Sequence, residues 1–275
     1  MADSVVYNIP ARMIGEYRGR PVIVRSDHPS DLVTRVSEED LKDLVCVQLL
    51  SLDNEIDDLI QWGESVPVDI VMRDPAEFPK LYSCADLLEN HPVRVSIPVM
   101  PGCSKAVKLA VSLNFAVKLI IAQPDQSLIE ELAQILNLYL HRPNVAQPVE
   151  YFHSTFLAFY HGQATSLWSV QEEDPALIRY VTDDGKEGIS PRLNGFAFAP
   201  DCAAVVADYQ RALLAEKGEC ENCEFWDNCG GYFKWPDKQY RCDGVKSLFR
   251  TLKEAAGELQ RELKSFDESQ GEKQP

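Results

Sequence analysis

The amino-acid sequence predicts an α/β protein, a partial (β/α) barrel followed by a small cysteine-rich C-terminal domain. Strand-like apolar segments alternate with amphipathic helical segments at roughly 25-residue spacing through the middle of the chain, which is typical of βα units and a parallel sheet. Half of the eight cysteines then fall within 23 residues near the C-terminus. We expect the barrel over residues 1–185, the cysteine-rich domain over residues 186–264 and a disordered polar tail over residues 265–275.

The chain begins with two short segments, residues 5–9 and 21–25, in which apolar and polar side chains alternate. This alternation, with a glycine between the segments, predicts two strands joined as a hairpin. Residues 37–40 combine a serine with three acidic residues, a typical helix start. Apolar positions at nearly helical spacing over residues 41–52 then predict a helix that ends by Gly63.

Three βα units follow. They comprise predicted strands over residues 66–72, 93–99 and 117–121, and predicted helices over residues 79–89, 104–113 and 127–140. A less regular aromatic stretch occupies residues 151–181. Two more helices are expected over residues 202–217 and 245–263, and the second is amphipathic and should pack on the body of the protein.

Composition excludes several classes of function. With 275 residues and 45% hydrophobic content, the chain can bury a large core. Its net charge of −16 disfavours binding to nucleic acids and to anionic membranes. No apolar run approaches the ~18 residues of a membrane span, and the first residues show no signal sequence, so a cytoplasmic protein is expected. The acidity either keeps the protein soluble or provides a face for a basic peptide or protein partner.

The C-terminal cysteines have the spacing Cys-x2-Cys-x5-Cys-x12-Cys. The expected metal ligands are Cys220, Cys223, Cys229 and Cys242. Four clustered thiolates select zinc or an iron–sulfur cluster over hard cations, and in a reducing compartment such cysteines are more often ligands than disulfides. The unequal gaps favour a 4Fe–4S cluster, because zinc modules usually pair two short knuckles. Gly230 and Gly231 would let the backbone approach a bulky core with positive φ. Zinc, a disulfide and reduced structural thiols remain the alternatives.

This cysteine pattern resembles the SPASM domain that follows the barrel in many radical SAM peptide maturases. In that family, a Cys-x2-Cys-x5-Cys run and one later cysteine bind the distal auxiliary 4Fe–4S cluster, so the resemblance implies one cluster on the four cysteines. Phe233 stands where the longer family motif has a further cysteine, which implies that a second cluster is absent. Residues 60–180 resemble the middle and later part of a radical SAM partial barrel, and residues 195–202 resemble the hairpin that opens a SPASM domain.

The catalytic motif of radical SAM enzymes, Cys-x3-Cys-x2-Cys, is missing from this sequence. The remaining cysteines are Cys46, Cys84, Cys103 and Cys202, which form no such triplet. We therefore expect neither S-adenosylmethionine binding nor radical formation by this chain alone. Cys46 and Cys84 are expected to be buried in helices, and Cys202 to be a leftover or buried thiol. Cys103 follows a predicted barrel strand and is either a site residue or a loop thiol.

No other group of residues gives a strong indication of a catalytic or binding site. No glycine-rich phosphate-binding loop occurs, and His153 and His161 are expected to be structural or surface residues. Four aromatic residues interleave with the cysteines, namely Phe225, Trp226, Tyr232 and Trp235. They are expected to shield the metal centre and pack the small domain, with a docking face for a peptide as the alternative.

Three functions are consistent with the sequence. The first is a non-catalytic or accessory SPASM-type iron–sulfur protein that assists peptide modification, as in the biosynthesis of ribosomally made peptides, or electron transfer, with a partner radical SAM enzyme. The second is a peptide- or protein-binding scaffold stabilised by zinc or a cluster without a redox role. The third is an enzyme whose active site lies at the strand ends of the α/β body.

Overall fold

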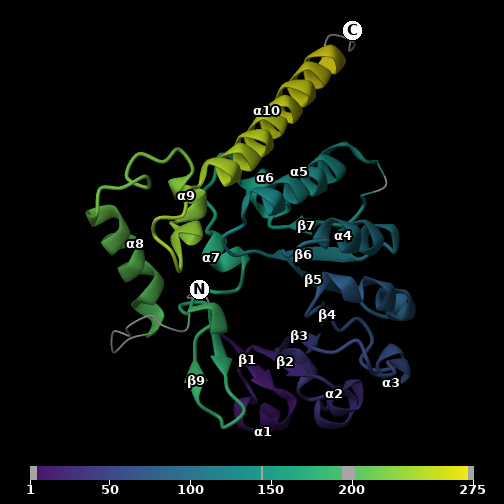
Figure 1. The fold of residues 1–275 in the computed structure, drawn as a ribbon. Coiled ribbons are helices and arrows are strands. Elements are labelled where there is room, and N and C mark those ends of the chain that lie inside the picture. The colour runs from purple at the N-terminus through teal and green to yellow at the C-terminus, as the bar shows by residue number, and fades with distance from the viewer. Residues whose placement is uncertain (1–4, 144, 194–201, 272–275) are drawn as a thin grey trace.

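The computed structural model describes residues 5–143, 145–193 and 202–271 (Figure 1). Its described strands are β1 (Val6–Pro10), β2 (Val22–Ser26), β3 (Leu44–Leu49), β4 (Val68–Val71), β5 (Val93–Pro98), β6 (Ala116–Ile120), β7 (Val149–Glu150), β8 (Ile178–Val181) and β9 (Glu187–Gly188). They form one sheet in the order β7-β6-β5-β4-β3-β2-β1-β8-β9. All neighbours are parallel except β8 and β9, which are antiparallel.

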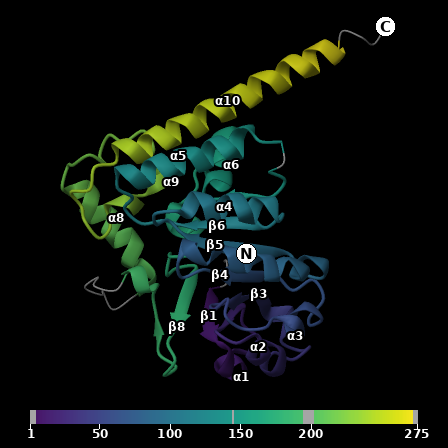
Figure 2. The same cartoon turned by 45° about the vertical axis from the view of Figure 1, so that its right-hand side comes forward.

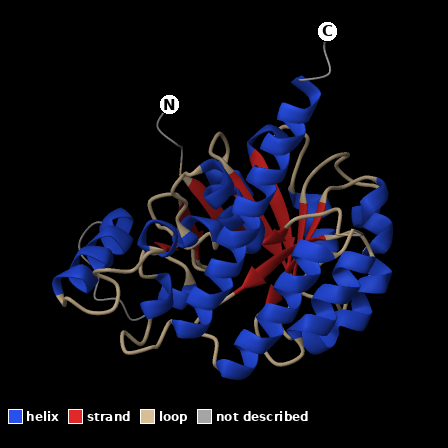
Figure 3. Cartoon of the chain, turned by 90° about the horizontal axis from the view of Figure 1, so that it is seen from above, coloured by secondary structure: helices blue, strands red, loops and turns tan. Residues whose placement is uncertain are grey.

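Helices connect and flank the strands. The α-helices among the described residues are α1 (Ile14–Tyr17), α2 (Pro29–Arg35), α3 (Asp57–Ile60), α4 (Cys103–Ser112), α5 (Gln126–His141), α6 (Phe152–His161), α7 (Leu167–Val170), α8 (Val205–Ala215), α9 (Trp226–Cys229) and α10 (Asp243–Gly271). A long 3-10 helix, η3 (Pro75–Glu89), connects β4 to β5, and shorter 3-10 turns are η1 (Ala11–Met13), η2 (Leu41–Asp43), η4 (Pro191–Leu193), η5 (Cys202–Ala204) and η6 (Tyr232–Lys234). Because parallel crossovers are almost always right-handed, strands that follow one another in sequence order place their helices on one face of the sheet. Figure 3 shows the helices around the outside of the strands.

The two faces of the sheet carry different residues. The outer face is apolar, as at Val47, Ile70 and Val95, which are fully buried in the hydrophobic core. The inner face carries polar residues such as Gln48 and Asp69 at adjacent positions of the strand register. A nine-stranded, mostly parallel sheet with helices on its outer face and polar residues within is compatible with a partial α/β barrel.

The sheet is not closed by backbone hydrogen bonds. Among the described strands, β7 and β9 are the two edges and no ladder joins β7 to β8. Residues 167–173, which we call the seam, connect β6 with β8 through side chains instead. Gln171 Nε2 donates to Leu119 O at 3.0 Å, and Tyr180 Oη donates to Glu172 O at 3.3 Å.

The C-terminal part of the chain packs on the same continuous core as the sheet. The indole of Trp168 in α7 stacks edge-on against Tyr232 with ring centroids 4.9 Å apart. Helix α10 lies against α5 and α6, and its C-terminal half projects from the body (Figures 1 and 2). No helix among the described residues combines the length and apolar character needed to cross a bilayer.

The structure confirms the three central βα units and the two C-terminal helices. Strands β4, β5 and β6 and helices η3, α4, α5, α8 and α10 lie where the sequence predicts them. Side chains that cap the helix N-termini explain why some helix positions could be predicted. The Asp125 carboxylate accepts from Leu128 N at 2.9 Å at the start of α5, and Asp74 with Glu77 forms a capping box on η3.

Three predictions are wrong. β1 and β2 are parallel neighbours rather than a hairpin, because a crossover through η1 and α1 separates them. The helix predicted over residues 41–52 is instead strand β3, and Cys46 lies in that strand. A strand that is largely buried on both faces has no alternation of apolar and polar residues. Its run of apolar residues therefore also fits the spacing of a helix. The tail predicted from residue 265 continues as helix α10 to Gly271. Most of the hairpin predicted over residues 195–202 lies outside the described residues.

Candidate functional site

The four C-terminal cysteines line one small cavity. Cys220 and Cys223 come from a tight turn, Cys229 ends α9, and Cys242 immediately precedes α10. None of the eight cysteines is in a disulfide. Three segments of the chain thus bring together the four residues that the sequence predicts as ligands.

Successive backbone turns produce this convergence. Cys223 N donates to Cys220 O at 3.3 Å, and Cys229 N donates to Phe225 O at 2.8 Å. Gly230 and Gly231 follow with φ of 55° and 74°, a backbone region that strongly favours glycine. A Cβ on Gly231 would lie 2.5 Å from Leu213 Cδ2. The glycines therefore allow α9 to pack closely on α8, and Gly231 also lines the cysteine cavity, where the sequence predicts a close approach to a metal core.

Charged side chains stand beside the cysteines. The Glu219 carboxylate accepts from Lys234 Nζ at 2.6 Å and from Lys246 Nζ at 2.5 Å, and all three residues line the cavity. Burial raises the pKa of the Cys229 thiol to about 11. Burial and the Glu219 carboxylate raise the pKa of Cys242 to about 12, while the Lys234 ammonium acts in the opposite direction. The lysines thus favour the thiolate forms that a metal centre requires, against the effect of burial.

Aromatic side chains seal the cavity on its inner side. Phe225, Phe233 and Phe249 line it and are almost fully buried, with Phe225 and Phe249 edge-on at 5.3 Å. Tyr232 lies deeper and donates its hydroxyl to Ile121 O at 2.8 Å, at the end of β6. Trp235 donates its indole N–H to Arg192 O. Burial of Phe225 and Tyr232 agrees with the expected packing role and leaves these two side chains unavailable for docking a peptide.

The donor set fits a soft metal, but the space between the cysteines is small. Four thiols in one pocket are suited to zinc or an iron–sulfur cluster. The cavity measures about 20 Å³, room for about one water molecule. Within the described part of the chain, no three His, Cys, Asp or Glu side chains stand where a single ion could bind them all. Loading either centre would therefore require the cysteine side chains to rearrange, and a four-iron core would require them to separate.

The other cysteines lie apart from this cavity. Cys84 is buried in η3, as predicted for a buried helical thiol, and Cys202 is half-buried. Cys103 is fully buried at the start of α4, where its thiol contacts Glu131 Oε2 at 3.5 Å. Because Cys103 lines none of the cavities described here, the structure places it in helix packing. Cys46 lies on the inner face of the sheet.

The histidines singled out in the sequence have structural or surface positions, as predicted. His153 Nδ1 lies 2.9 Å from Tyr139 Oη, and His161 is exposed at the end of α6.

A second candidate site is the polar network on the inner face of the sheet. Asp69 accepts hydrogen bonds from Gln48 Nε2 at 2.9 Å, Arg94 Nη2 at 2.7 Å and Ser96 Oγ at 2.7 Å. Gln48 Oε1 in turn accepts from Asn8 Nδ2 at 2.7 Å. Asn8 Oδ1 accepts from Arg25 Nη1 in β2 at 2.7 Å, so the network spans β1 to β5.

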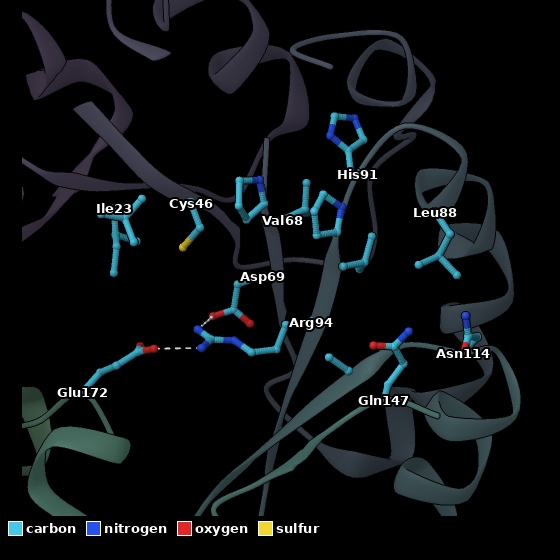
Figure 4. Close-up of a pocket in the computed structure, with 15 residues that line it drawn as sticks. Ile23, Cys46, Val68, Asp69, Leu88, His91, Arg94, Asn114, Gln147 and Glu172 are labelled. Atoms are coloured by element: carbon cyan, nitrogen blue, oxygen red, sulfur yellow. Dashed lines mark hydrogen bonds and ion pairs between the residues drawn. The ribbon is translucent and has the colours of Figure 1, made fainter. Parts of the chain in front are cut away.

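Glu172 in the seam completes this network. Its carboxylate accepts from Arg94 Nη1 at 2.8 Å (Figure 4). It also pairs with Lys118 Nζ at 2.7 Å. The backbone of Glu172 has φ 59°, which is unusual for a residue other than glycine. The chain thus adopts a strained conformation at the point where the carboxylate reaches two cations.

The charges of the network stabilise one another. Burial alone would raise the pKa of Asp69, but the Arg94 guanidinium outweighs this effect and the pKa lies below its usual range. The pKa of Glu172 is likewise lowered, because Lys118 and Arg94 outweigh burial. For Glu173, burial outweighs the pairing with Arg192 and raises the pKa.

The network divides the space inside the sheet into two cavities that share Glu172. The amino-end cavity, about 510 Å³, lies at the amino ends of the strands and is lined by Cys46, His91 and Arg94 among mostly apolar residues (Figure 4). Both ring nitrogens of His91 contact backbone carbonyl oxygens at 2.9 Å, so this histidine has a structural role. The carboxyl-end cavity, about 640 Å³, lies at the carboxyl ends, where parallel α/β folds usually bind ligands.

Sequence reasoning missed this network although a signal was present. Polar residues interrupt the short apolar strands, as in Val-Asp-Ile at Asp69, Val-Arg-Val at Arg94 and Val-Lys-Leu at Lys118. Such residues on buried strands have to face one another or a cavity, because an unpaired buried charge is costly.

Comparison with known proteins adds no assignment. No protein-family model, curated protein or solved structure matches this chain. The likeness to radical SAM and SPASM proteins therefore rests on cysteine spacing and the order of elements.

Proposed function

We propose that this protein is a non-catalytic, accessory iron–sulfur protein of the SPASM type. Cys220, Cys223, Cys229 and Cys242 would hold one 4Fe–4S cluster. The protein would assist the modification of a peptide or protein, or electron transfer, together with a partner radical SAM enzyme. The convergence of four unpaired cysteines from three segments on one cavity is the observation that supports this proposal most.

The surroundings of the cysteines suit such a centre. A cluster bound by four protein sulfurs supplies one-electron redox chemistry and leaves no iron open to substrate. Lys234 and Lys246 would offset the negative charge of the thiolates, and the buried phenylalanines would exclude water. The sheet would then correspond to a degenerate radical SAM barrel without a site for S-adenosylmethionine.

The small cavity volume favours zinc as the second candidate. A single ion needs less space between the sulfurs than a four-iron core, and the protein would then be a peptide- or protein-binding scaffold without redox role. The third candidate, an enzyme with its site at the strand ends, is supported by the charged residues that line the carboxyl-end cavity.

Metal analysis of anaerobically purified protein tests the proposal. We expect about four irons and four sulfides per chain, with a brown colour, for a 4Fe–4S cluster. The Cys229→Ala variant should lose the iron, whereas Cys84→Ala, which alters a buried cysteine outside the cavity, should retain it. About one zinc per chain in a colourless protein would favour the scaffold instead. Iron content that is unchanged in Cys229→Ala would contradict the ligand assignment.

The accessory role has its own test. A cluster that transfers electrons should be reduced by dithionite and reoxidised faster when a partner radical SAM enzyme is added. A cluster that keeps one oxidation state through the reaction would indicate a structural centre.

A further inference from the structure

Arg25, near the end of β2, is a half-buried guanidinium that lines the carboxyl-end cavity. Its Nη1 donates to Asn8 O and to Asn8 Oδ1, both at 2.7 Å, and its Nη2 donates to Val181 O. All three acceptors are neutral. These contacts fix the guanidinium between β1 and β8 without balancing its charge.

The other cations of the carboxyl-end cavity have carboxylate partners. Lys118 pairs with Glu172 at 2.7 Å, and Arg192 pairs with Glu173 at 2.7 Å. No carboxylate among the described residues lies within ion-pair distance of Arg25. Asp183, whose charge acts on Arg25 from further away, is paired with Arg12 at 3.0 Å. Burial lowers the pKa of Arg25, as expected for a cation without a partner.

The residues that line the carboxyl-end cavity therefore carry a surplus of one positive charge. Arg25 also lines a second cavity with Asp27, Asp31 and Asp183, but these carboxylates pair with Arg73, Arg35 and Arg12. Three cationic residues and two carboxylates line it, in a protein whose net charge is −16. A monovalent anion would neutralise this surplus, whereas a divalent phosphate ester would leave excess negative charge beside Glu172 and Glu173. The planar guanidinium has unused N–H donors on Nε and Nη2, and a carboxylate can accept from two such donors at once.

We infer that the carboxyl-end cavity binds a ligand through a single carboxylate group, and that Arg25 is the residue that pairs with it. The carboxylate belongs to a free organic acid or to the C-terminus of a peptide, because both present the same group. This inference does not depend on the metal centre, since the cavity and the four cysteines share no lining residue.

Matched probes test the carboxylate. Isothermal titration of the full chain with N-acetyl-tetra-alanine and with its C-terminal amide compares ligands that differ only in the carboxylate. We expect the acid to bind roughly tenfold or more tightly than the amide, as for a charge-assisted hydrogen bond in a partly dry site. N-acetylalanine serves as the small free acid and inorganic phosphate as the competing anion. Binding of the small acid alone would identify a free acid as the ligand, and binding of the tetrapeptide acid alone would identify a peptide C-terminus.

Variants test the role of Arg25. Arg25→Met should weaken binding of the preferred acid roughly tenfold, while Arg142→Met, which removes an exposed arginine away from the cavity, should leave it unchanged. If Arg25→Met does not fold, Asn8→Asp supplies a carboxylate next to Nη1 and should weaken binding to a similar extent. Equal binding of acid and amide, tighter binding of phosphate, no binding of either acid, or unaltered binding by the folded variants would overturn the inference.

Discussion

Replacing Asp69 by asparagine tests whether the inner-face network stabilises the fold. Asp69 is 2% exposed and its carboxylate lies 2.7 Å from Arg94 Nη2. At this distance and an effective dielectric of about 20, the gross Coulomb attraction is about 6 kcal/mol. Asparagine keeps the shape and one acceptor oxygen, and Arg94 keeps Glu172 at 2.8 Å. We therefore expect Asp69→Asn to lower the free energy of unfolding by about 3 kcal/mol, at the lower end of the cost of breaking a buried pair.

Urea denaturation at pH 7, followed by tryptophan fluorescence, measures this change. Asp27→Asn is the matched control, because Asp27 pairs with Arg73 at the surface and should cost less than about 1 kcal/mol. The double variant Asp69→Asn/Arg94→Gln should lose at least about 1 kcal/mol less than the sum of the single variants. A loss below about 1 kcal/mol for Asp69→Asn, or additive losses in the double variant, would refute the coupling.

Three further outcomes follow from the structure. Gly231→Ala should cost more than about 2 kcal/mol in thermal unfolding, since its Cβ would lie 2.5 Å from Leu213 Cδ2 at φ 74°, whereas Gly218→Ala, with no atom within 4 Å, should be nearly neutral. Glu172→Gly should be about 1 kcal/mol more stable than Glu172→Ala, because the backbone φ of 59° favours glycine, and equal stabilities would contradict this reading. Because the folded-state pKa values of Asp69 and Glu172 are lowered, their stabilisation is present above the unfolded pKa of about 4 and is lost as the pH falls through the folded values. Acid titration followed by circular dichroism should therefore show a shallower loss of stability in Asp69→Asn than in the wild type.

The parts of the fold that the sequence predicts correctly are those with strong local signals. The βα units around β4, β5 and β6 have short apolar strands, and caps such as Asp125 mark their helices. The arrangement of the first three strands was harder to predict, because it depends on pairing between segments that are distant in the sequence. β1 pairs with both β2 and β8, and residues 6–8 lie opposite residues 178–180 across most of the chain length. The local amino-acid sequence of β1 does not indicate which distant strand it pairs with.

For the candidate sites, sequence and structure contribute different information. Cysteine spacing alone indicated the four residues that line the C-terminal cavity, since thiols at short intervals are rare by chance. The inner-face network required the register of the sheet, which places Gln48, Asp69 and Arg94 side by side on three strands. Arg25 could not be singled out beforehand, because its lack of a carboxylate partner depends on where every other charge lies.

The seam has a consequence for access to the interior. Residues 167–173 connect β6 with β8 by side-chain bonds and not by a ladder, and Leu167 and Trp168 are fully buried, so opening this segment would cost core packing but no strand pairing. Its amides should exchange with deuterium through local opening, well before those of the central strands, which exchange only on wider unfolding. Access to the interior through this segment would therefore cost the burial of Trp168 and the ion pairs of Glu172.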